Sequence, residues 1–455
     1  MKKLIVTVLT LTLVLGCTRQ QSQSGGAASG GSAADKTKIV EYTWWSDAER
    51  AMGEALVADF EKANPDISVE QNYIAYNDYH SKINTMIASG TTPDIMYLNE
   101  YLVSEWGEKG VTEDLTPLYR EAGIDPKTYY IDSALYSTGG KLWGVNVTST
   151  MVVLYYNKEM FRAAGITPPP ESAVSPWTWD QYVAAAKKLT KDANGNTPND
   201  PGFNYNNLVQ YGTVMPTSWI YVLPLLYAGG TSVANAAGTA LEITSPAAIK
   251  VIQSIANLAL VDKVAPTVAM TNTNAFSSLP AMLMNGQLGM FIGGTFNFSD
   301  FANEGYDVGI AQIPSMAGRG SNMVWSSGFV AKKGVSKAAF KLFTWLVDFN
   351  NWVTASKNHN VGLTGLPQTN SVFNDPAKNA AWTAIYPASM AKISGDILQN
   401  GSRLGENVTL KNFSEIMDQT IAPVLDKIWL GTETAQQALP PLNQVLQGKL
   451  QGVWQ

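Results

Sequence analysis

Short strand-like runs alternate with helix-like segments near the start of the chain. Residues 39–45 and 94–98 are rich in apolar and aromatic side chains, and residues 67–70 alternate apolar with polar, so each segment predicts a strand. Residues 52–60 place an apolar side chain at every fourth position, which is one face of a helix, and residues 82–89 also predict a helix. Strands and helices in this order predict an α/β fold with a parallel sheet and crossover helices.

Later helices carry signals at their first residues. Thr178, with Gln181 three residues on, fits a capping box, in which each of the two side chains bonds a backbone N–H of the other residue. Ser245 followed by Pro246 fits an N-cap with proline at the first helical position. Residues 337–350 are strongly apolar and predict a further helix.

The first residues have the pattern of an export signal. Two lysines precede a mostly apolar run over residues 4–15, which is too short to cross about 30 Å of hydrocarbon. Residues 14–17, Val-Leu-Gly-Cys, resemble the lipobox of bacterial lipoprotein signal peptides. The resemblance implies that residues 1–16 are a signal peptide and that Cys17, the only cysteine, carries a lipid. An ordinary cleaved signal with an incidental cysteine is the alternative.

A polar segment follows the cysteine. Residues 17–36 consist mainly of Gln, Ser, Gly and Ala, a composition that cannot bury enough apolar surface to fold, so we expect a lipidated flexible tether. The protein is then exported and held at a membrane surface, in the periplasm or on the outer face of the cytoplasmic membrane. Thr18 gives no retention signal, so the membrane that holds the anchor stays open.

Composition excludes several function classes. Apolar residues make up 45% of the chain and charged residues 15%, which fits a packed globular protein. The formal net charge of −6 argues against a nucleic-acid partner, because phosphates call for clusters of Lys and Arg. His80 and His359 lie far apart and no HExxH or CxxC spacing occurs, so we expect neither a zinc site nor a cofactor.

One polar segment is a weak calcium candidate. Its oxygen-bearing side chains alternate along the chain at Asp192, Asn194, Asn196 and Asp200. A calcium loop of EF-hand type needs Gly at its sixth position and Glu at its twelfth, where this chain has Thr197 and Phe203. We therefore interpret the segment as a polar loop rich in Asx turns.

Five segments, in this order, resemble the extracellular solute-binding proteins that serve sugar ABC transporters, the maltose-binding-protein-like group. They are residues 60–70, residues 90–118, residues 140–144 with 154–159 and 179–180, residues 289–296, and residues 327–349. One departure is that Gly294-Thr295-Phe296 stands where many relatives have Gly-Pro-Trp or Gly-Ser-Trp. An aromatic ring is retained there.

The resemblance implies a two-lobed periplasmic-binding-protein clamshell, each lobe a mostly parallel sheet flanked by helices, with a hinge of several strands. Lobe one would be residues 37–146 and 312–363, and lobe two residues 147–311 and 364–455. Ligand would bind between the lobes, which close over it by hinge motion. The implied partners are a carbohydrate and the permease subunits of an ABC transporter, and we expect a monomer.

A sugar site needs aromatic rings for the C–H faces of the pyranose and polar groups for its hydroxyls. In open α/β sheets such groups follow the carboxyl ends of strands. After the first predicted strand come Trp44, Trp45, Asp47 and Arg50. Because neighbouring strand residues face opposite ways, we expect one of the two tryptophans to pack in the core.

Asn99 and Glu100 follow the third predicted strand, although Asn99 could instead cap the next helix. Trp219 is a candidate for an aromatic contact with the sugar, and the alternative is that it is a buried helix residue. The other candidates are Asn146, Thr148 and Ser149 at the first hinge crossing, Trp219, Phe296, Asn297, Trp325, Ser327, and Trp382, Tyr386 and Arg403 on C-terminal helices.

The leading hypothesis is a lipid-anchored receptor that binds a mono- or oligosaccharide and delivers it to an ABC permease. An exported glycosidase is an alternative, since Asp47 and Glu100 could serve as paired carboxylates, but no GxSxG nucleophile motif occurs. The same fold with a non-sugar solute is a third possibility. We therefore predict no catalytic residue.

Overall fold

The structure is a computed structural model. It describes residues 36–45, 47–271, 276, 278–363, 365–384 and 388–454. These residues fall in the second of two compact units of the chain, Lys36–Gln455. The signal-like segment, Cys17 and the tether up to residue 35 lie outside the described residues, as do Ser46 and Tyr386.

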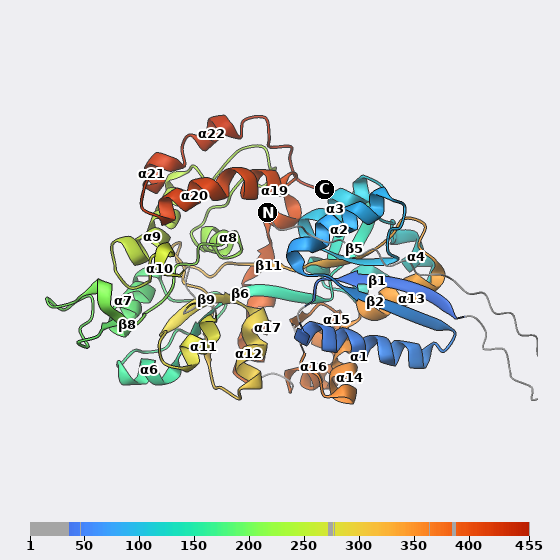
Figure 1. The fold of residues 1–455 in the computed structure, drawn as a ribbon, viewed down its shortest axis with the longest axis horizontal. Helices are drawn as coiled ribbons and strands as arrows, with labels where there is room; N and C mark the ends of the chain where they lie inside the picture. The colour runs from blue at the N-terminus through green and yellow to red at the C-terminus, as the bar shows by residue number, and fades with distance from the viewer. Residues whose placement is uncertain are drawn as a thin grey trace, which may run out of the picture. The chain divides into compact units, whose positions relative to one another are not determined.

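The first sheet contains six strands in the order β2-β1-β3-β12-β5-β4. Its strands β1 and β2 lie side by side (Figure 1). Strand β1 pairs in parallel with β2 and β3, whereas β12 pairs antiparallel with β3 and β5, and β4 pairs antiparallel with β5. The strands are β1 Thr37–Thr43, β2 Ile67–Tyr73, β3 Ile95–Leu98, β4 Leu135–Thr138, β5 Lys141–Val145 and β12 Gly328–Ala331.

Both faces of this sheet are covered, because alternate residues of its central strands enter different cores. Ile95 and Tyr97 belong to the cluster that includes residues of α1 (Asp47–Ala63) and α13 (Lys337–Leu346). Met96 and Leu98 belong to the cluster that includes residues of α2 (Tyr76–Ala88) and α3 (Glu100–Glu108). Strand β3 is thus buried on both sides, which explains its continuous apolar run.

The second sheet is built around the long strand β6. Its order is β10-β6-β11-β14, and β9 and β13 also pair with β6. All the pairs with β6 are antiparallel, and only β11 and β14 run parallel. The strands are β6 Thr148–Tyr156, β9 Met290–Gly294, β10 Gly309–Ala311, β11 Asn322–Trp325, β13 Leu366–Pro367 and β14 Ser402–Leu404.

The two sheets are therefore mixed, and the expectation of mostly parallel sheets is corrected. The parallel strand-helix-strand pattern holds from β1 to β3. Afterwards β4 and β5 form a hairpin, and β12 inserts between β3 and β5 from more than 180 residues away in the sequence. An antiparallel neighbour needs no crossover helix, so the local pattern gives no sign of it.

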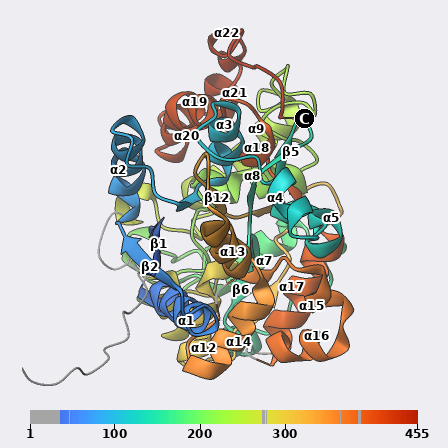
Figure 2. The same ribbon diagram turned by 90° about the vertical axis from the view of Figure 1, so that its right-hand side faces the viewer.

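The remaining elements connect and cover the sheets. Between β3 and β9 they are α4 Thr116–Glu121, α5 Pro126–Tyr129, η1 Asp132–Ala134, α6 Lys158–Ala163, α7 Trp179–Leu189, β7 Lys191–Asp192, η2 Tyr205–Asn207, β8 Leu208–Gln210, α8 Trp219–Ala228, α9 Pro246–Leu260, α10 Val268–Thr271 and α11 Leu279–Met284. After β9 they are η4 Thr295–Asn297, α12 Phe298–Asn303, α14 Phe349–His359, α15 Asn370–Asn374, α16 Pro376–Thr383, α17 Ala388–Asn400, α18 Glu406–Thr409, α19 Phe413–Ile416, η5 Met417–Ile421, α20 Ala422–Trp429, α21 Ala435–Ala438 and α22 Leu442–Val445. Helices α14, α15 and α16 lie together (Figures 1 and 2).

The capping signals are confirmed. Thr178 and Gln181 form the reciprocal capping box at the start of α7. The Ser245 side chain accepts a hydrogen bond from the backbone N–H of Ala248, and Pro246 is the first residue of α9. The predicted helix at 337–350 is divided into α13 and α14.

The chain passes from the first sheet to the second between β5 and β6, returns between β11 and β12, and enters the second sheet again between β12 and β13. Residues 322–325, predicted in lobe one, thus lie in a strand of the second sheet. The first core cluster contains Phe329 from β12 together with Tyr155 from β6, so it spans both sheets. The lobe boundaries stay a prediction. Among the helices of the described part, none is long and apolar enough to cross a membrane.

Candidate functional site

An aromatic cluster lies where β1 and β3 end. Trp44, the residue after β1, is half-buried and contacts four rings. Its ring centroid lies 5.6 Å from Tyr76, 4.8 Å from Tyr79, 5.3 Å from His80 and 4.8 Å from Tyr97. Burial lowers the pKa of His80, which favours its neutral form. The rings come from the residue after β1, from α2 and from β3, so the cluster joins the carboxyl ends of two strands to the helix that precedes β3.

Trp45 faces the other way and is only 5% exposed. Its ring makes edge contacts with Tyr97, Phe329 and Trp352 in the first core cluster. The expectation that one of the two tryptophans packs in the core is met by Trp45. Trp44 is the one nearer to the surface.

Asn99 connects the first residues of α2 and α3. Its Nδ2 donates hydrogen bonds to the hydroxyl oxygens of Tyr76 at 2.9 Å and of Tyr101 at 2.8 Å. Asn99 occupies the N-cap position of α3, but its side chain makes no capping hydrogen bond. The alternative role as a helix cap is therefore not the one that its side chain performs.

Glu100 connects α3 to a C-terminal helix. It is 5% exposed, and its Oε1 accepts a hydrogen bond of 2.8 Å from Nδ2 of Asn407 on α18. Burial raises the pKa of Glu100, the hydrogen bond from Asn407 lowers it in part, and the carboxylate of Asp418 raises it further. Burial also raises the pKa of Asp418, which accepts a hydrogen bond from Ser414.

Rings continue from Tyr101 toward the second sheet. The ring centroid of Tyr101 lies 6.5 Å from that of Phe413 on α19. The ring centroid of Phe413 lies 5.2 Å from that of Trp219, the first residue of α8. Trp219 is half-buried, not a fully buried helix residue. We call the rings Trp44, Tyr76, Tyr101, Phe413 and Trp219 the aromatic series. It links α2 and α3, beside the first sheet, to α8 and α19.

Ser327 joins this region and Trp325 does not. Burial raises the pKa of Tyr97, and the nearby Ser326 and Ser327 lower it in part, so Ser327 lies close to the phenol of a ring that touches Trp44. Trp325, on β11, is 9% exposed and packs in the second core cluster.

The hinge candidates are buried. Asn146, between β5 and β6, is 1% exposed and lies beside the hydroxyl of Tyr136. Thr148 and Ser149 begin β6 and are also buried, and Oγ of Ser149 accepts a hydrogen bond from Gln368. Oδ1 and Nδ2 of Asn146 are buried without a hydrogen-bond partner among the described residues, and the ligand-binding role of these side chains stays a prediction.

The comparisons with known proteins identify the family. The model of the bacterial extracellular solute-binding proteins matches residues 45–348. The chain belongs to this family. Its members are non-catalytic binding proteins, which confirms that the protein is not an enzyme and removes the glycosidase alternative.

Individual relatives of this solute-binding protein are known. An ABC substrate-binding protein of Listeria monocytogenes, solved in complex with cycloalternan, has a TM-score of 0.76 and 27% identity, and the match covers 91% of this chain and 99% of that one. The maltotriose-bound MalE domain of Bdellovibrio bacteriovorus has a TM-score of 0.69 at 21% identity over 91% of this chain and 99% of that one. The melibiose/raffinose/stachyose-binding protein MelE of Bacillus subtilis is 26% identical over 43% of this chain and 42% of its own length. The predicted fold, a periplasmic-binding-protein fold with two helix-flanked sheets, is confirmed.

Two of the predicted ligand-binding residues of the solute-binding protein, Asp47 and Arg50, belong to α1. Asp47 is the first residue of α1, and its side chain lies outside the description. The guanidinium of Arg50 lies 4.8 Å from the ring centroid of Tyr73 on β2.

Phe296 and Asn297 belong to the short helix η4 after β9. Phe296 is 49% exposed, and its ring folds over Gly294, where an added Cβ would lie 2.0 Å from it. Asn297 donates a hydrogen bond of 3.2 Å to Asp300. A side chain at position 294 would therefore require this half-exposed ring to move.

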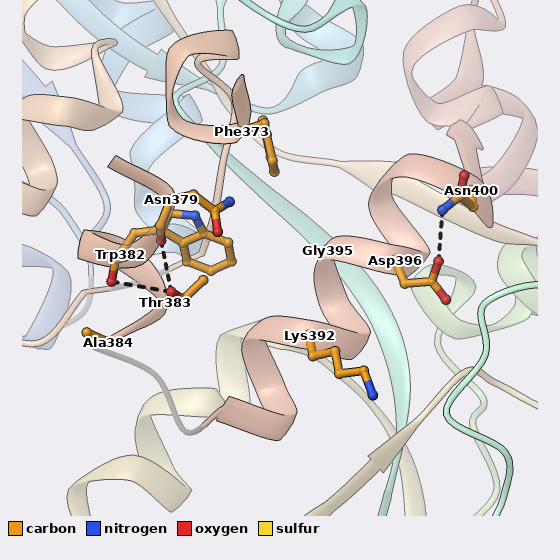
Figure 3. A pocket seen from close by; sticks show the side chains of 10 residues that line it. Phe373, Asn379, Trp382, Thr383, Ala384, Lys392, Gly395, Asp396 and Asn400 are labelled. Atoms are coloured by element: carbon orange, nitrogen blue, oxygen red, sulfur yellow. Dashed lines mark hydrogen bonds between the residues drawn. The ribbon is translucent and has the colours of Figure 1, made fainter. Parts of the chain in front are cut away.

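Trp382 lies apart from the aromatic series, at a pocket of about 630 Å³ between α16 and α17 (Figure 3). It is 2% exposed and belongs to the first core cluster. Across the pocket, both carboxylate oxygens of Asp396 are engaged, by the backbone N–H of Ala173 and by Asn400. Arg403 was expected on a helix but lies on β14, where its guanidinium is 3.6 Å from the ring centroid of Tyr227.

The weak calcium candidate is a hydrogen-bonded Asx loop. The carboxylate of Asp192 accepts hydrogen bonds from the backbone N–H groups of Asn194, Asn196 and Asn204, each at 2.9 Å. Burial alone would raise the pKa of Asp192, but these hydrogen bonds lower it. Asp200 accepts from Thr197, and in the described part of the chain no three acidic, His or Cys side chains form a metal-binding group.

Sequence reasoning missed three residues that the contacts place with the site: Tyr76, Asn407 and Phe413. Tyr101 directly follows Asn99 and Glu100, and its position after a predicted strand already marked it. Tyr76 begins a helix whose predicted start, residue 82, was six residues too late. Asn407 and Phe413 are brought in by tertiary contacts that no local pattern indicates.

Proposed function

We propose that the protein is a receptor that binds an oligosaccharide at the aromatic series and delivers it to an ABC permease. The observation that carries the proposal is that Trp44, Tyr76, Tyr101, Phe413 and Trp219 form one set of rings drawn from elements beside both sheets. The relatives from L. monocytogenes and B. subtilis, whose ligands are carbohydrates by name, support the assignment.

The chemistry beside these rings suits a sugar. Asn99, Glu100 and Ser327 place amide, carboxyl and hydroxyl groups next to the rings. Aromatic rings cover the C–H faces of a pyranose, and a small number of polar groups fix its orientation through the hydroxyls. A ligand that lacked those hydroxyls would leave buried polar groups without partners, at a cost of about 1–3 kcal/mol for each group.

In the proposed mechanism the ligand is enclosed by hinge motion. The chain crosses between the sheets at β5–β6 and at β11–β12, and these strands would serve as the hinge. The hydrogen bond of Glu100 with Asn407 joins elements from the two sides of the aromatic series and would hold them together. Closure then follows from contacts that the ligand makes with both sides at once.

The proposal includes the lipid anchor at Cys17. A tether of about twenty residues, residues 17–36, would keep the binding unit at high local concentration near its permease. Labelling of the exported protein with palmitate, and loss of the label in Cys17→Ser, tests this part; a labelled Cys17→Ser variant contradicts it.

The test of the proposed function is equilibrium binding. Melibiose, raffinose, stachyose and cycloalternan are titrated against the purified protein, with calorimetry and intrinsic Trp fluorescence as readouts. Mannitol, an acyclic polyol, is the control that has hydroxyls but no pyranose ring. We expect saturable binding of at least one of the oligosaccharides, and Trp44→Ala to raise its Kd about tenfold or more because a stacking ring is lost.

Val209→Ala is the matched control, because Val209 is an exposed apolar residue of β8, away from the site. It should bind like the wild type. A wild-type protein that binds none of the oligosaccharides, or a Trp44→Ala variant with wild-type affinity, contradicts the proposal.

A further inference from the structure

A group of polar side chains is buried between the first sheet and α1. Glu41 and Thr43 of β1 are each 1% exposed, and they share a face with Ile39 of the first core cluster. The register of β1 with β2 places Gln71 beside Glu41 and Tyr73 beside Thr43. Four polar side chains therefore lie together on the face of the sheet that α1 covers.

Three oxygen atoms of this group have no hydrogen-bond partner among the described residues. They are Oε1 of Glu41, Oγ1 of Thr43 and the hydroxyl oxygen of Tyr73, and all three are shielded from solvent. The other carboxyl oxygen of Glu41, Oε2, accepts a hydrogen bond of 2.9 Å from Gln71. Buried polar atoms are nearly always paired, so unpaired oxygens at neighbouring positions of two strands call for an explanation.

Helix α1 lies directly on this group. An added Cβ at Gly53 would lie 3.3 Å from the hydroxyl oxygen of Tyr73, and the guanidinium of Arg50 lies 4.8 Å from the centroid of the Tyr73 ring. The same helix begins at Asp47, and the residue that follows β1 is Trp44 of the aromatic series. A change beneath α1 therefore acts on the strand and the helix that carry one side of the proposed ligand site.

Glu41 is the member of the group that changes charge near neutral pH. Burial raises its pKa to about 7, and the hydrogen bond from Gln71 lowers it in part. Burial also raises the pKa of Tyr73, the carboxylates of Glu41 and Glu54 raise it further, and Arg50 lowers it in part. The remaining charged groups on elements around β1 are ion-paired or exposed: Asp94 with Lys332, Glu70 with Lys38, and Lys337 and Lys341 of α13.

The observed packing of α1 suits a neutral Glu41. An ionised carboxyl at this position would need a donor or a cation at Oε1, because an unpaired buried charge is costly. Water that enters beneath α1, or a cation that moves to Oε1, would supply this need, and either would change the contact of α1 with β1 and β2. A ligand that contacts Trp44 and the start of α1 fixes that contact, so its binding favours the protonated carboxyl.

We propose that Glu41 is a proton-linked switch beneath α1, which favours ligand binding when it is protonated and weakens binding when it ionises. This inference rests on the proposed function and names the regulation of the same site. Because linkage is reciprocal, binding of the ligand draws a proton onto Glu41, and a rise in pH through neutrality lowers the affinity for the ligand.

The experiment measures binding and proton uptake together. The tightest binder among melibiose, raffinose, stachyose and cycloalternan is titrated by calorimetry at pH 6, 7 and 8.5. At pH 7 the titration is repeated in two buffers with different ionisation enthalpies, which gives the number of protons taken up. The proteins are the wild type, Glu41→Gln and Glu70→Gln, and thermal unfolding shows that each is folded at every pH.

We expect the Kd of the wild type to be about fivefold higher or more at pH 8.5 than at pH 6. The wild type should take up a fraction of a proton on binding at pH 7, a result that needs no variant. Glu41→Gln is always neutral, so it should keep the low Kd at every pH and take up no proton. Glu70→Gln is the matched control and should follow the wild type, because it removes an exposed carboxylate from the other face of β2.

A second readout needs no ligand. Hydrogen exchange of the backbone over residues 47–57 is compared between the wild type and Glu41→Gln at the same pH, so that the intrinsic pH dependence of exchange cancels. We expect equal exchange at pH 6 and faster exchange in the wild type at pH 8.5, because ionised Glu41 loosens the contact of α1 with the sheet.

The outcomes separate the two proposals. If the wild type binds an oligosaccharide with the same Kd at every pH, or without proton uptake, the switch is wrong and the proposed function stands. The same conclusion follows if Glu41→Gln keeps the pH dependence of the wild type. If the wild type binds no oligosaccharide at any pH, the proposed function fails, and the switch fails with it even where the exchange of α1 depends on Glu41.

Discussion

At the scale of single residues, the most unusual group is the carboxyl of Glu41 in β1. It is 1% exposed, its Oε2 accepts a hydrogen bond from Gln71, and its Oε1 has no partner among the described residues. Burial raises its pKa from 4.5 to about 7, and the hydrogen bond from Gln71 lowers it in part. The native state therefore favours the protonated form more than the unfolded chain does.

The consequence is a pH dependence of stability with a defined sign. Between pH 4.5 and about 7 the native state binds more protons at Glu41 than the unfolded state, so stability falls as the pH rises through this window. Glu41→Gln stays neutral and keeps an acceptor for Gln71. Relative to wild type, its free energy of unfolding should be unchanged near pH 4.5 and about 3 kcal/mol higher above pH 7.

Urea unfolding of both proteins at pH 5, 6, 7 and 8 measures this difference. Using the difference between variant and wild type removes the contribution of all other titrating groups. A difference that does not change between pH 5 and pH 8 would contradict the assignment of the window to Glu41.

At the scale of elements, the sequence predicted what depends on local spacing. The stripe of Met52, Leu56 and Phe60 places α1, and Thr178 with Gln181 places the start of α7. The sequence pattern could not predict that β12 inserts beside β3, because that pairing joins segments far apart in the chain. For the same reason Asn99 and Glu100 could be named as site candidates, whereas their partners Tyr76 and Asn407 could not.

The packing of α1 supplies a prediction on this scale. An added Cβ at Gly53 in α1 would lie 2.3 Å from the ring of Trp45, so the helix packs on this ring only because position 53 has no side chain. Gly53→Ala should destabilise the protein by about 1–3 kcal/mol through overpacking. Gly395 in α17 is the matched control, because a Cβ there meets no atom within 4 Å.

Gly395→Ala should leave stability equal or raise it by up to about 1 kcal/mol, since alanine is the better helix former. Thermal and urea unfolding of the two variants, with near-UV circular dichroism to follow the environment of Trp45, test the pair. Equal effects of the two substitutions would show that Trp45 does not need the space at Gly53.

At the scale of the whole described unit, the aromatic series crosses from elements beside the first sheet to elements beside the second. Its rings are held by two polar links, Asn99 to the two tyrosines and Glu100 to Asn407. The second link is the one that joins α3 to the C-terminal helices. Each partner of a buried pair depends on the other, because a carboxyl left without its donor pays the full cost of desolvation.

This dependence predicts a coupling free energy between the two residues. Asn407→Ala should destabilise the ligand-free protein by about 1–3 kcal/mol, since it leaves the buried Glu100 carboxyl without its hydrogen bond. Glu100→Gln is neutral and keeps an acceptor oxygen for Asn407, so it should cost less. In the double variant the loss of stability should be smaller than the sum of the two single losses by about 1 kcal/mol or more.

The control is Asn64→Ala. Asn64 is a buried asparagine whose side chain donates a hydrogen bond to the carbonyl of Phe60, and the effect of its substitution should add to that of Glu100→Gln without coupling. Urea unfolding at pH 7 measures the wild type, the three single variants and the two double variants. Additivity in the first cycle would mean that the hydrogen bond does not hold α3 to the C-terminal helices in solution.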